Sequence, residues 1–420
     1  MANGMGLSTG RSLAVLAALA ALAYAPLLTI PLIEDDYPNL WMALDLGRPA
    51  GAVALLRNPV FQMRATSFWA MYALWGIARL APWIYHLVSL LLHVANTWLV
   101  YAICLAWPRM RPAALWAAAF FAIQEGHQEA VMWFSAINEL LQFLFGMGAL
   151  WCWLTRERGW GRQLAGLLLF GLALLSKESA VIVLPLMVLA TPPNEWRRAV
   201  WRIAPYVALT GLAVALVLAS RGTSFRFSDG SFSWQAPFWT TWPRNYGRVV
   251  WIWGLPAAAG VLLARDGRLW RASGTALAWI GIALLPYCFL TYSAQIPSRQ
   301  TYLASAGLAM LVGLAMAWWQ PRWDRRMVTA VLLVVLLHNV GYLWIRKRSQ
   351  FLERAAPTEQ LIALARSTPG PIWVRCFPRN SFIAEGAVHL AAGYTANQLV
   401  WNEADAVQRK TTATFCYSRR

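Results

Sequence analysis

The sequence carries little charge for its length. Asp, Glu, Lys and Arg make up 13% of its 420 residues, whereas soluble domains carry about a quarter. The 18 acidic residues are outnumbered by 36 Lys and Arg, and few of these basic residues are Lys. Hydrophobic residues reach 59%, and apolar runs long enough to cross a bilayer recur along the chain. This composition excludes a soluble domain and predicts a polytopic, all-α membrane protein.

Two other absences narrow the function. The five cysteines have no paired spacing, which argues against a zinc site. No basic soluble domain is present, so nucleic-acid binding is not expected. Cys376 and Cys416 both lie in the C-terminal tail and could form a disulfide if that compartment is oxidising. The remaining cysteines, Cys104, Cys152 and Cys288, lie in apolar runs and are expected to pack in the core.

The apolar runs predict about eleven membrane spans. They lie near residues 12–31, 83–106, 112–124, 138–154, 162–175, 178–191, 203–220, 246–264, 273–292, 302–319 and 327–345. The third, fifth and sixth are shorter than the roughly 20 residues that a span needs, so the count has a margin of one or two. No small-residue cleavage site follows the first run, which we therefore expect to be retained as a span.

The arginines predict the orientation. Five short loops, at 108–112, 155–162, 192–202, 265–271 and 321–326, each hold two or three Arg. By the positive-inside rule these loops are cytoplasmic, as is the N-terminus. The loops at 34–66, 124–137, 221–248 and 292–301 and the tail after Ile345 then lie outside the cell.

The net charge of +18 leaves two explanations open. Positive-inside topology and attraction to anionic lipids account for much of it. An outer surface that binds phosphate would account for the arginines that fall in the outer loops. These are Arg48, Arg57, Arg64, Arg221, Arg226, Arg244, Arg248 and Arg299.

The sequence predicts two parts, a membrane domain at residues 1–348 and a small extracytoplasmic α/β region at 349–420. In the first outer loop, residues 39–46 and 50–56 have the pattern of short helices that lie flat on the bilayer. Residues 65–80 predict a re-entrant or tilted helix before Pro82. Residues 222–245 have the composition of a mobile lid or of a substrate platform. In the tail we expect a helix at 357–367, a strand at 372–377 and a helix at 381–392.

Polar residues interrupt the apolar sequence near the predicted outer face. Glu34, Asp35 and Asp36 directly follow the first span, where solvation of a helix end competes with a role as general base or metal ligand. Residues 124–129 precede a polar helical stripe that includes Asn138 and Glu139. Such a stripe faces either protein or a water-filled cavity, and hydrogen bonding between helices explains it equally well.

Two further sets contain cations. Lys177 and Glu178 lie between two apolar runs, where a charged pair is costly unless it is paired or functional. Arg299 and Tyr302 precede the tenth span, and an Arg can bind phosphate bidentately, although an interfacial Arg is ordinarily only an anchor. His86, Ser89, His93 and Asn96 share one helix face and are interpreted as scaffold first and as site lining second.

Taken in order, these pieces resemble the GT-C glycosyltransferases that use polyprenyl-phosphate sugars. They are most similar to the relatives of the protein O-mannosyltransferases, including the transmembrane O-mannosyltransferases with tetratricopeptide tails. The matching segments are residues 34–36, 85–88 with 92–93, 127–131 with Trp133 and Asn138, 175–178, and Arg299 with 302–303 and 305–307. Departures from the family pattern at Gln124, Glu125, Ile137 and Ala304 leave the sugar and the acceptor open.

The resemblance implies an inverting transfer of a sugar from a polyprenyl-phosphate donor to a lipid, glycan or protein hydroxyl, outside the bacterial inner (plasma) membrane. Asp35, or otherwise Asp36, would be the general base. The donor phosphate would contact Arg299 and Lys177, with Arg64 and Tyr302 beside them. The residues that would line the sugar or acceptor pocket are Glu34, His86, His93, His127, Glu129, Asn138, Glu139 and Glu178. No cofactor is expected, although Asp35, Asp36, His127 and Glu129 could hold a divalent metal.

Two other functions use similar residues. A transporter or flippase for polyprenyl-linked lipids would need charges through the membrane depth and helices broken near the midplane. A ligase or polymerase of the O-antigen kind would centre on an arginine-rich outer loop late in the chain. The early acidic cluster favours catalysis at the membrane surface over either of them.

Overall fold

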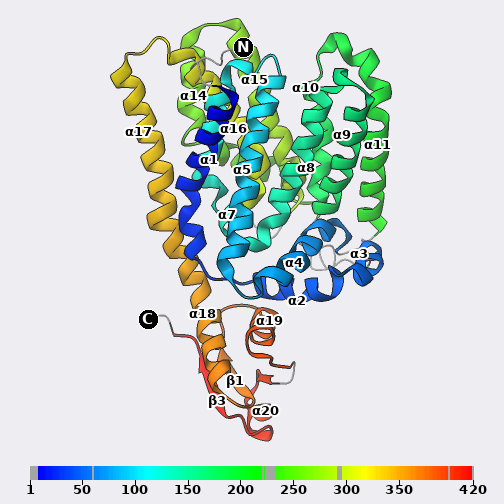
Figure 1. Cartoon of the computed structure of the whole chain (residues 1–420), viewed down its shortest axis with the longest axis vertical. Helices are drawn as coiled ribbons and strands as arrows, with labels where there is room; N and C mark the ends of the chain where they lie inside the picture. Colours follow the sequence, from blue (N-terminus) through cyan, green and yellow to red (C-terminus); the bar gives the residue numbers. More distant parts are fainter. Residues whose placement is uncertain are drawn as a thin grey trace.

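The computed structural model describes residues 8–58, 61–219, 222, 233–290, 296–395 and 398–418. A bundle of long helices forms most of the molecule, and a small unit lies below it at the C-terminal end (Figure 1). The bundle helices are α1 (Thr9–Tyr24), α5 (Pro82–Ala106), α6 (Ala114–Ile123), α7 (Gln128–Met132), α8 (Ile137–Leu154), α9 (Trp160–Ser176), α10 (Val183–Ala190), α11 (Trp196–Ala219), α13 (Phe238–Val250), α14 (Gly254–Ala264), α15 (Gly267–Leu284), α16 (Tyr302–Trp319) and α17 (Arg325–Gly341).

The number of membrane spans is smaller than predicted. Among the described residues, seven helices are long and apolar enough to cross a bilayer, or eight if one bent pair counts as a span. The prediction of about eleven was therefore too high. Three of the predicted spans are helices that stop short of the required length, Arg111–Ile123, Trp160–Ser176 and Glu178–Ala190. Neighbouring helices cover most of Arg111–Ile123, whereas Leu164, Leu168 and Val188 of the other two helices are exposed.

One predicted span, at 246–264, is broken. Its two halves, α13 and α14, meet at an angle of 76°. The break leaves residues 251–253 between the two helices, and all three are turn residues. Irregular backbone at membrane depth is tolerated where it is buried in protein or lines a cavity, and a large cavity does lie against this break.

A layer of short helices covers the lower end of the bundle. It consists of α2 (Asp36–Leu46), α3 (Ala52–Arg57) and α4 (Ala65–Ala78), and it lies between the bundle and the C-terminal unit (Figure 1). The two short helices predicted at 39–46 and 50–56 are thus found as α2 and α3, and their position on the bilayer stays a prediction. Gly47 lets α2 and α4 approach closely, because a Cβ atom there would lie 2.3 Å from the carbonyl oxygen of Phe68.

The ends of the bundle agree with the arginine pattern. Helix α1 begins at the end that is farthest from the C-terminal unit, and the connections from α8 to α9, from α10 to α11 and from α16 to α17 lie at that same end (Figure 1). These are loops for which the sequence predicts a cytoplasmic position. The two ends of the bundle therefore differ. The arginine-rich loops lie at one end, and the turn with Glu34, Asp35 and Asp36 lies with the C-terminal unit at the other.

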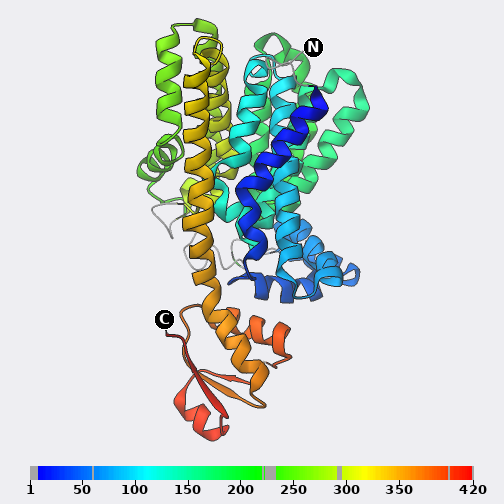
Figure 2. The same ribbon diagram turned by 60° about the vertical axis from the view of Figure 1, so that its left-hand side comes forward.

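The C-terminal unit is an α/β structure on a helix that continues the last span. Helix α17 passes through a π-helical stretch (Tyr342–Lys347) into α18 (Arg348–Ser367), and Figure 2 shows the result as one long rod. The helix predicted from residue 357 thus begins earlier, and Pro357 lies inside it. Three parallel strands follow in the order β2 (Leu399–Val400), β1 (Ile372–Cys376) and β3 (Ala413–Cys416), with α19 (Ser381–Ala392) and α20 (Glu403–Gln408).

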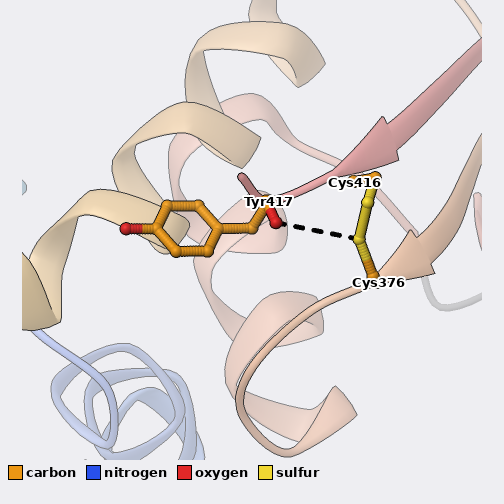
Figure 3. The surroundings of a disulfide bond; sticks show 3 residues. All are labelled: Cys376, Cys416 and Tyr417. Carbon is orange, nitrogen blue, oxygen red and sulfur yellow. Dashed lines mark hydrogen bonds between the residues drawn. A yellow bond between two sulfur atoms is a disulfide. The ribbon is translucent and has the colours of Figure 1, made fainter. Parts of the chain in front are cut away.

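A disulfide joins the central strand of this sheet to one of its outer strands. Cys376 ends β1, Cys416 ends β3, and their sulfur atoms are bonded (Figure 3). The disulfide that the sequence left open is therefore confirmed. The carbonyl oxygen of Tyr417 lies 3.8 Å from the Cys376 sulfur. Cys104, Cys152 and Cys288 are buried and free, as predicted.

The C-terminal unit docks on the acidic end of the bundle through α19 and α18. A Cβ atom at Gly386 would lie 3.0 Å from the Pro38 nitrogen, so α19 and α2 are in direct contact. The Tyr37 hydroxyl donates to Glu359 at 3.0 Å, and Trp41 packs against His389 with ring centroids 4.6 Å apart. These contacts bring a distant part of the chain against the turn that holds Asp35.

Candidate active site

The three acids of the first outer loop form a tight turn with three different environments. Glu34 has a φ of +46°, a left-handed conformation that costs a non-glycine residue about 1–2 kcal/mol. Asp36 is fully buried. Its carboxylate accepts hydrogen bonds from the Ile33 amide at 2.8 Å and from both the amide and the hydroxyl of Ser135 at 2.7 Å. Asp36 therefore joins the first loop to the start of α8.

Asp35 is the exposed member of the turn. It stands at the N-cap position of α2, yet its side chain makes no capping hydrogen bond. The pKa of the Asp35 carboxyl is raised, first because the surrounding protein displaces part of its water and then because the Glu34 carboxylate is near. The cations Arg299, Arg354 and Arg379 lower this pKa in opposition. Burial raises the pKa of Asp36 to about 7, against its three hydrogen bonds. Of the two, only Asp35 has a carboxylate that a substrate can reach.

Two arginines of the C-terminal unit hold Glu34. The guanidinium of Arg354 donates from Nε and Nη2 to the two carboxylate oxygens of Glu34, at 3.1 and 2.5 Å. Arg379 pairs with the same carboxylate at 2.9 Å. Charge-assisted, forked pairing of this kind is among the stronger polar contacts in proteins, so it stabilises the left-handed turn that fixes where Asp35 lies.

Trp133 brings a third arginine, Arg299, close to Arg354. The guanidinium carbons of Arg299 and Arg354 each lie 4.8 Å from a Trp133 ring centroid. Arg299 comes from a single-turn helix (Ser298–Thr301) before α16, and Arg354 comes from α18. Glu129 fixes the Arg299 backbone through a 3.2 Å hydrogen bond and lies 3.9 Å from its guanidinium. The exposed carboxylate of Asp35 thus interacts with Arg299 of the membrane part and with Arg354 of the C-terminal unit.

A cavity of about 580 Å³ adjoins this set. Gln128 and Ser298, the neighbours of Glu129 and Arg299, line it and share a 2.6 Å hydrogen bond. The broken span supplies an apolar wall with Trp251, Ile252 and Trp253. The cations of the lining are Arg244, Arg248 and Lys347. A pocket with an apolar side and several cations suits a molecule with an anionic head and a hydrophobic chain.

Lys177 and Arg64 belong to a different cluster. Lys177 forms a buried ion pair with Glu139 and lies 3.2 Å from the Tyr287 hydroxyl. The Arg64 guanidinium forms a forked pair with Glu178, one arm of it at 3.1 Å. These four side chains tie the lower ends of α8 and α9 to the loop before α4, and each charge has its partner. Their predicted roles in phosphate and sugar binding stay predictions.

Tyr302, His93 and His127 lie inside the bundle. The Tyr302 hydroxyl lies 2.8 Å from Nδ1 of His93 and 3.3 Å from the Asn96 amide nitrogen. Nε2 of His127 is 2.6 Å from the hydroxyl of Ser305, which lines the cavity. This group of rings is fully enclosed, so it supports the cavity wall from behind rather than facing a substrate.

The remaining predicted site residues are placed separately. His86 is buried next to the backbone of Ile30 and Pro31, and Asn138 is half-buried in the first turn of α8. Within the described residues, no group of three His, Cys, Asp or Glu side chains could hold a metal ion. The four residues suggested as metal ligands lie apart from one another. Asp35 is in the exposed turn and Asp36 contacts Ser135, whereas His127 is in the ring cluster and Glu129 pairs with Arg299.

The sequence did not identify the arginines of the C-terminal unit as site residues. Arg354 and Arg379 lie beyond the predicted domain boundary, and their contact with Glu34 depends on how α18 and β1 dock. The one available signal was composition, because both are basic residues in a tail predicted to lie on the same side as the acids. Arg221 and Arg226 lie outside the described residues.

Comparisons with known proteins agree with this architecture. No family model matches the chain. Over 253 residues it is 26% identical to the protein O-mannosyl-transferase Tmtc1 of Drosophila melanogaster, a match that covers 46% of this chain and 29% of that protein. Among solved structures, ArnT from Cupriavidus metallidurans superimposes with a TM-score of 0.55 at 14% identity, over 91% of this chain and 85% of that one.

The oligosaccharyltransferase AglB of Archaeoglobus fulgidus, in complex with an inhibitory peptide and a dolichol-phosphate, gives a TM-score of 0.52 at 12% identity. That match covers 93% of this chain and 64% of AglB. Both matches extend over more than nine-tenths of this chain. The chain therefore shares the fold of ArnT and AglB, as the resemblance to the GT-C superfamily implied.

Proposed function

We propose that this protein is an integral-membrane glycosyltransferase that transfers a sugar from a polyprenyl-phosphate donor to an acceptor hydroxyl, with inversion, at the extracytoplasmic face. The single observation that carries the proposal is the arrangement around Asp35. An accessible carboxylate stands on a fixed turn at the end of the bundle, and three arginines lie within electrostatic reach of it. The fold shared with ArnT and AglB gives this arrangement its context.

Asp35 is the general base of the proposed reaction. It removes the proton of the acceptor hydroxyl while the acceptor oxygen attacks the anomeric carbon and the bond from that carbon to the phosphate oxygen breaks. A general base works best when its pKa approaches the working pH, and the pKa of Asp35 is raised toward that range. Asp36, with its three hydrogen bonds, serves instead to hold the turn.

The arginines stabilise the leaving group. As the bond to the sugar breaks, the phosphodiester becomes a polyprenyl phosphate with an additional negative charge, so fixed cations lower the energy of the transition state. Arg299 is the best candidate for direct contact, because its neighbour Ser298 lines the cavity and because it interacts electrostatically with Asp35. Lys177 and Arg64 are less suited to this role, since Glu139 and Glu178 already neutralise them.

The cavity accounts for binding of the donor lipid. Its cationic lining of Arg244, Arg248 and Lys347 would hold the phosphate, and the tryptophans of the broken span would contact the polyprenyl chain. AglB has been solved with a dolichol-phosphate, a ligand of the same chemical class. Donor entry from the bilayer would then deliver the phosphate beside Arg299.

The test is a transfer assay with Asp35→Asn in purified, nanodisc-embedded protein. The parent is screened with a panel of polyprenyl-phosphate sugars for transfer to added acceptors and for transfer to water. Asp35→Asn should lower the rate with the active donor by about 10²–10⁴-fold, without changing the unfolding midpoint.

The matched control is Asp45→Asn, since Asp45 is an exposed acid in the helix that follows Asp35 and pairs with the exposed Arg48. This variant should keep the parent's activity. Equal rates for Asp35→Asn and the parent would refute the assignment of the base. A parent that turns over no polyprenyl-phosphate sugar, with or without acceptor, would refute the proposed function itself.

A further inference from the structure

A second pocket lies in the C-terminal unit, on the side of Arg379. It has a volume of about 450 Å³ and lies beside the disulfide, between the end of β1, the start of α19 and the turn after β2. Trp401 and Phe377 give it aromatic surface, and Arg375 and Arg379 give it positive charge. The disulfide between Cys376 and Cys416 fixes one wall by joining the ends of β1 and β3 (Figure 3).

This pocket adjoins the catalytic turn. Arg379 lines the pocket and at the same time pairs with Glu34, the residue before Asp35. Arg299 directly follows Ser298, which lines the donor cavity. Asp35 interacts electrostatically with both Arg379 and Arg299. A base that deprotonates an acceptor must be close to both substrates, and these two arginines link Asp35 to both cavities.

The charge of the pocket indicates what it binds. Arg375 is exposed and forms no ion pair with any residue in the described part of the chain. Arg379 has part of its guanidinium engaged by Glu34 and the remainder free to reach a ligand. Trp401 is 37% exposed, and an exposed indole provides a flat apolar face for a sugar ring, whose C–H groups pack well on aromatic surface. An aromatic face beside an unneutralised arginine suits a saccharide that carries an acidic group.

The geometry points to this pocket as the acceptor site, and to an acidic saccharide as the acceptor class. This inference rests on the proposed function. The saccharide lies on Trp401 with its acidic group on Arg375, and one hydroxyl reaches Asp35. Asp35 takes the proton of that hydroxyl, and the oxygen of the hydroxyl bonds to the anomeric carbon of the donor sugar. Polyprenyl phosphate leaves with the electron pair of the broken bond.

The experiment measures binding and turnover of two matched saccharides. One is an oligosaccharide that contains a uronic acid, and the other is the same compound with its carboxylates reduced to alcohols. Binding to the full chain in nanodiscs is followed by saturation-transfer NMR, which needs no donor. We expect the parent to bind the acidic compound about two- to fivefold more tightly, as one exposed charge pair would give.

Three variants locate the site, and a fourth serves as control. Arg375→Gln should remove the preference for the acidic compound by raising its Kd and its KM, and Arg375→Lys should restore part of that preference. Trp401→Ala should weaken both compounds alike. Lys410→Gln removes an exposed cation of the same unit outside the pocket and should change neither value. Transfer of the donor sugar to water by the Lys410→Gln control should stay at the parent's rate.

The outcomes separate this inference from the proposed function. If the parent binds both saccharides equally, or if Arg375→Gln keeps the preference, the acceptor site is not in this pocket. The same conclusion follows if a Ser/Thr peptide is a better acceptor than either saccharide. If the acidic compound binds as expected but no polyprenyl-phosphate sugar is turned over, the pocket stands as a saccharide site and the proposed function fails.

Discussion

Two clusters of charged residues at the same end of the bundle differ in how their charges are matched. In the closed cluster, Lys177 pairs with Glu139 and Arg64 with Glu178, and three of these four side chains are at least 85% buried. In the open cluster, Asp35 is exposed and Arg299 and Arg379 retain 27% and 41% of their side-chain surface. The closed cluster has no charge left for a substrate, whereas the open one does.

The comparison shows why charge in an apolar sequence is an ambiguous signal. Both clusters were expected to bind substrate, because a charge near a membrane is costly unless it is paired or functional. The structure satisfies that condition by pairing in one cluster and by exposure in the other. The closed cluster is therefore expected to contribute to stability and the open one to catalysis, and the following changes test that division.

The largest effect on stability is expected from Lys177→Met. This change leaves the Glu139 carboxylate buried without its partner, which costs about 3–5 kcal/mol in comparable cases. Unfolding of the reconstituted protein in SDS measures the loss. The double change Lys177→Met with Glu139→Gln removes both charges and should recover much of it. A stable Lys177→Met protein that has lost donor turnover would instead assign Lys177 to the active site.

The open cluster should respond in the opposite way. Arg299→Gln removes a cation beside the leaving phosphate and should lower the rate by about 10²–10³-fold, with little change in the SDS unfolding midpoint. Arg299→Lys should keep part of the rate, since it preserves the charge but not the fork. Should Arg299→Gln unfold the protein while the surviving fraction turns over donor normally, the arginine would be structural.

The link between Glu34 and Arg354 should give a coupling of intermediate size. Glu34→Gln, Arg354→Gln and the double variant form a thermodynamic cycle, and a forked pair in contact is expected to couple by about 1–3 kcal/mol. Because the pair fixes the turn before Asp35, both single variants should also lower kcat more than they raise the KM for donor. Additive effects in the cycle would show that the C-terminal unit does not support this turn.

The last prediction concerns the pH dependence of stability. The pKa of Asp36 is raised in the folded protein to about 7, so between about pH 4 and pH 7 the folded state binds a proton that the unfolded state has released. Asp36 thus contributes stability at low pH that is lost as the pH rises toward 7, by at most about 1.4 kcal/mol per pH unit. Asp36→Asn should flatten the unfolding midpoint over this range, and Asp45→Asn should not. Parallel profiles for Asp36→Asn and the parent would contradict the raised pKa.

Hydropathy and local pattern predicted much of the fold. The apolar runs located the bundle helices, and the turn residues before Ile372 located β1, because both signals depend on short-range sequence. The number of spans was too high since a run such as 112–124 looks the same whether lipid or protein covers it. Pro357 suggested a helix start, but a continuous rod places it inside α18.

The site was less accessible from sequence. Glu34, Asp35 and Asp36 are adjacent and chemically alike, and only the fold separates one that is clamped, one that is exposed and one that is buried. The pairing of Lys177 with Glu139 depends on how α8 meets the end of α9. Arg354 and Arg379 approach Glu34 from more than 300 residues away, a contact that no local pattern encodes.

The most direct test of the division between the two clusters is the position of the donor phosphate. A cryo-EM structure of the nanodisc-embedded protein with bound undecaprenyl phosphate would show which cations hold it. The account predicts the phosphate in the cavity beside Arg299, on the side that faces Asp35. Phosphate bound to Lys177 and Arg64, with their pairs to Glu139 and Glu178 broken, would contradict it.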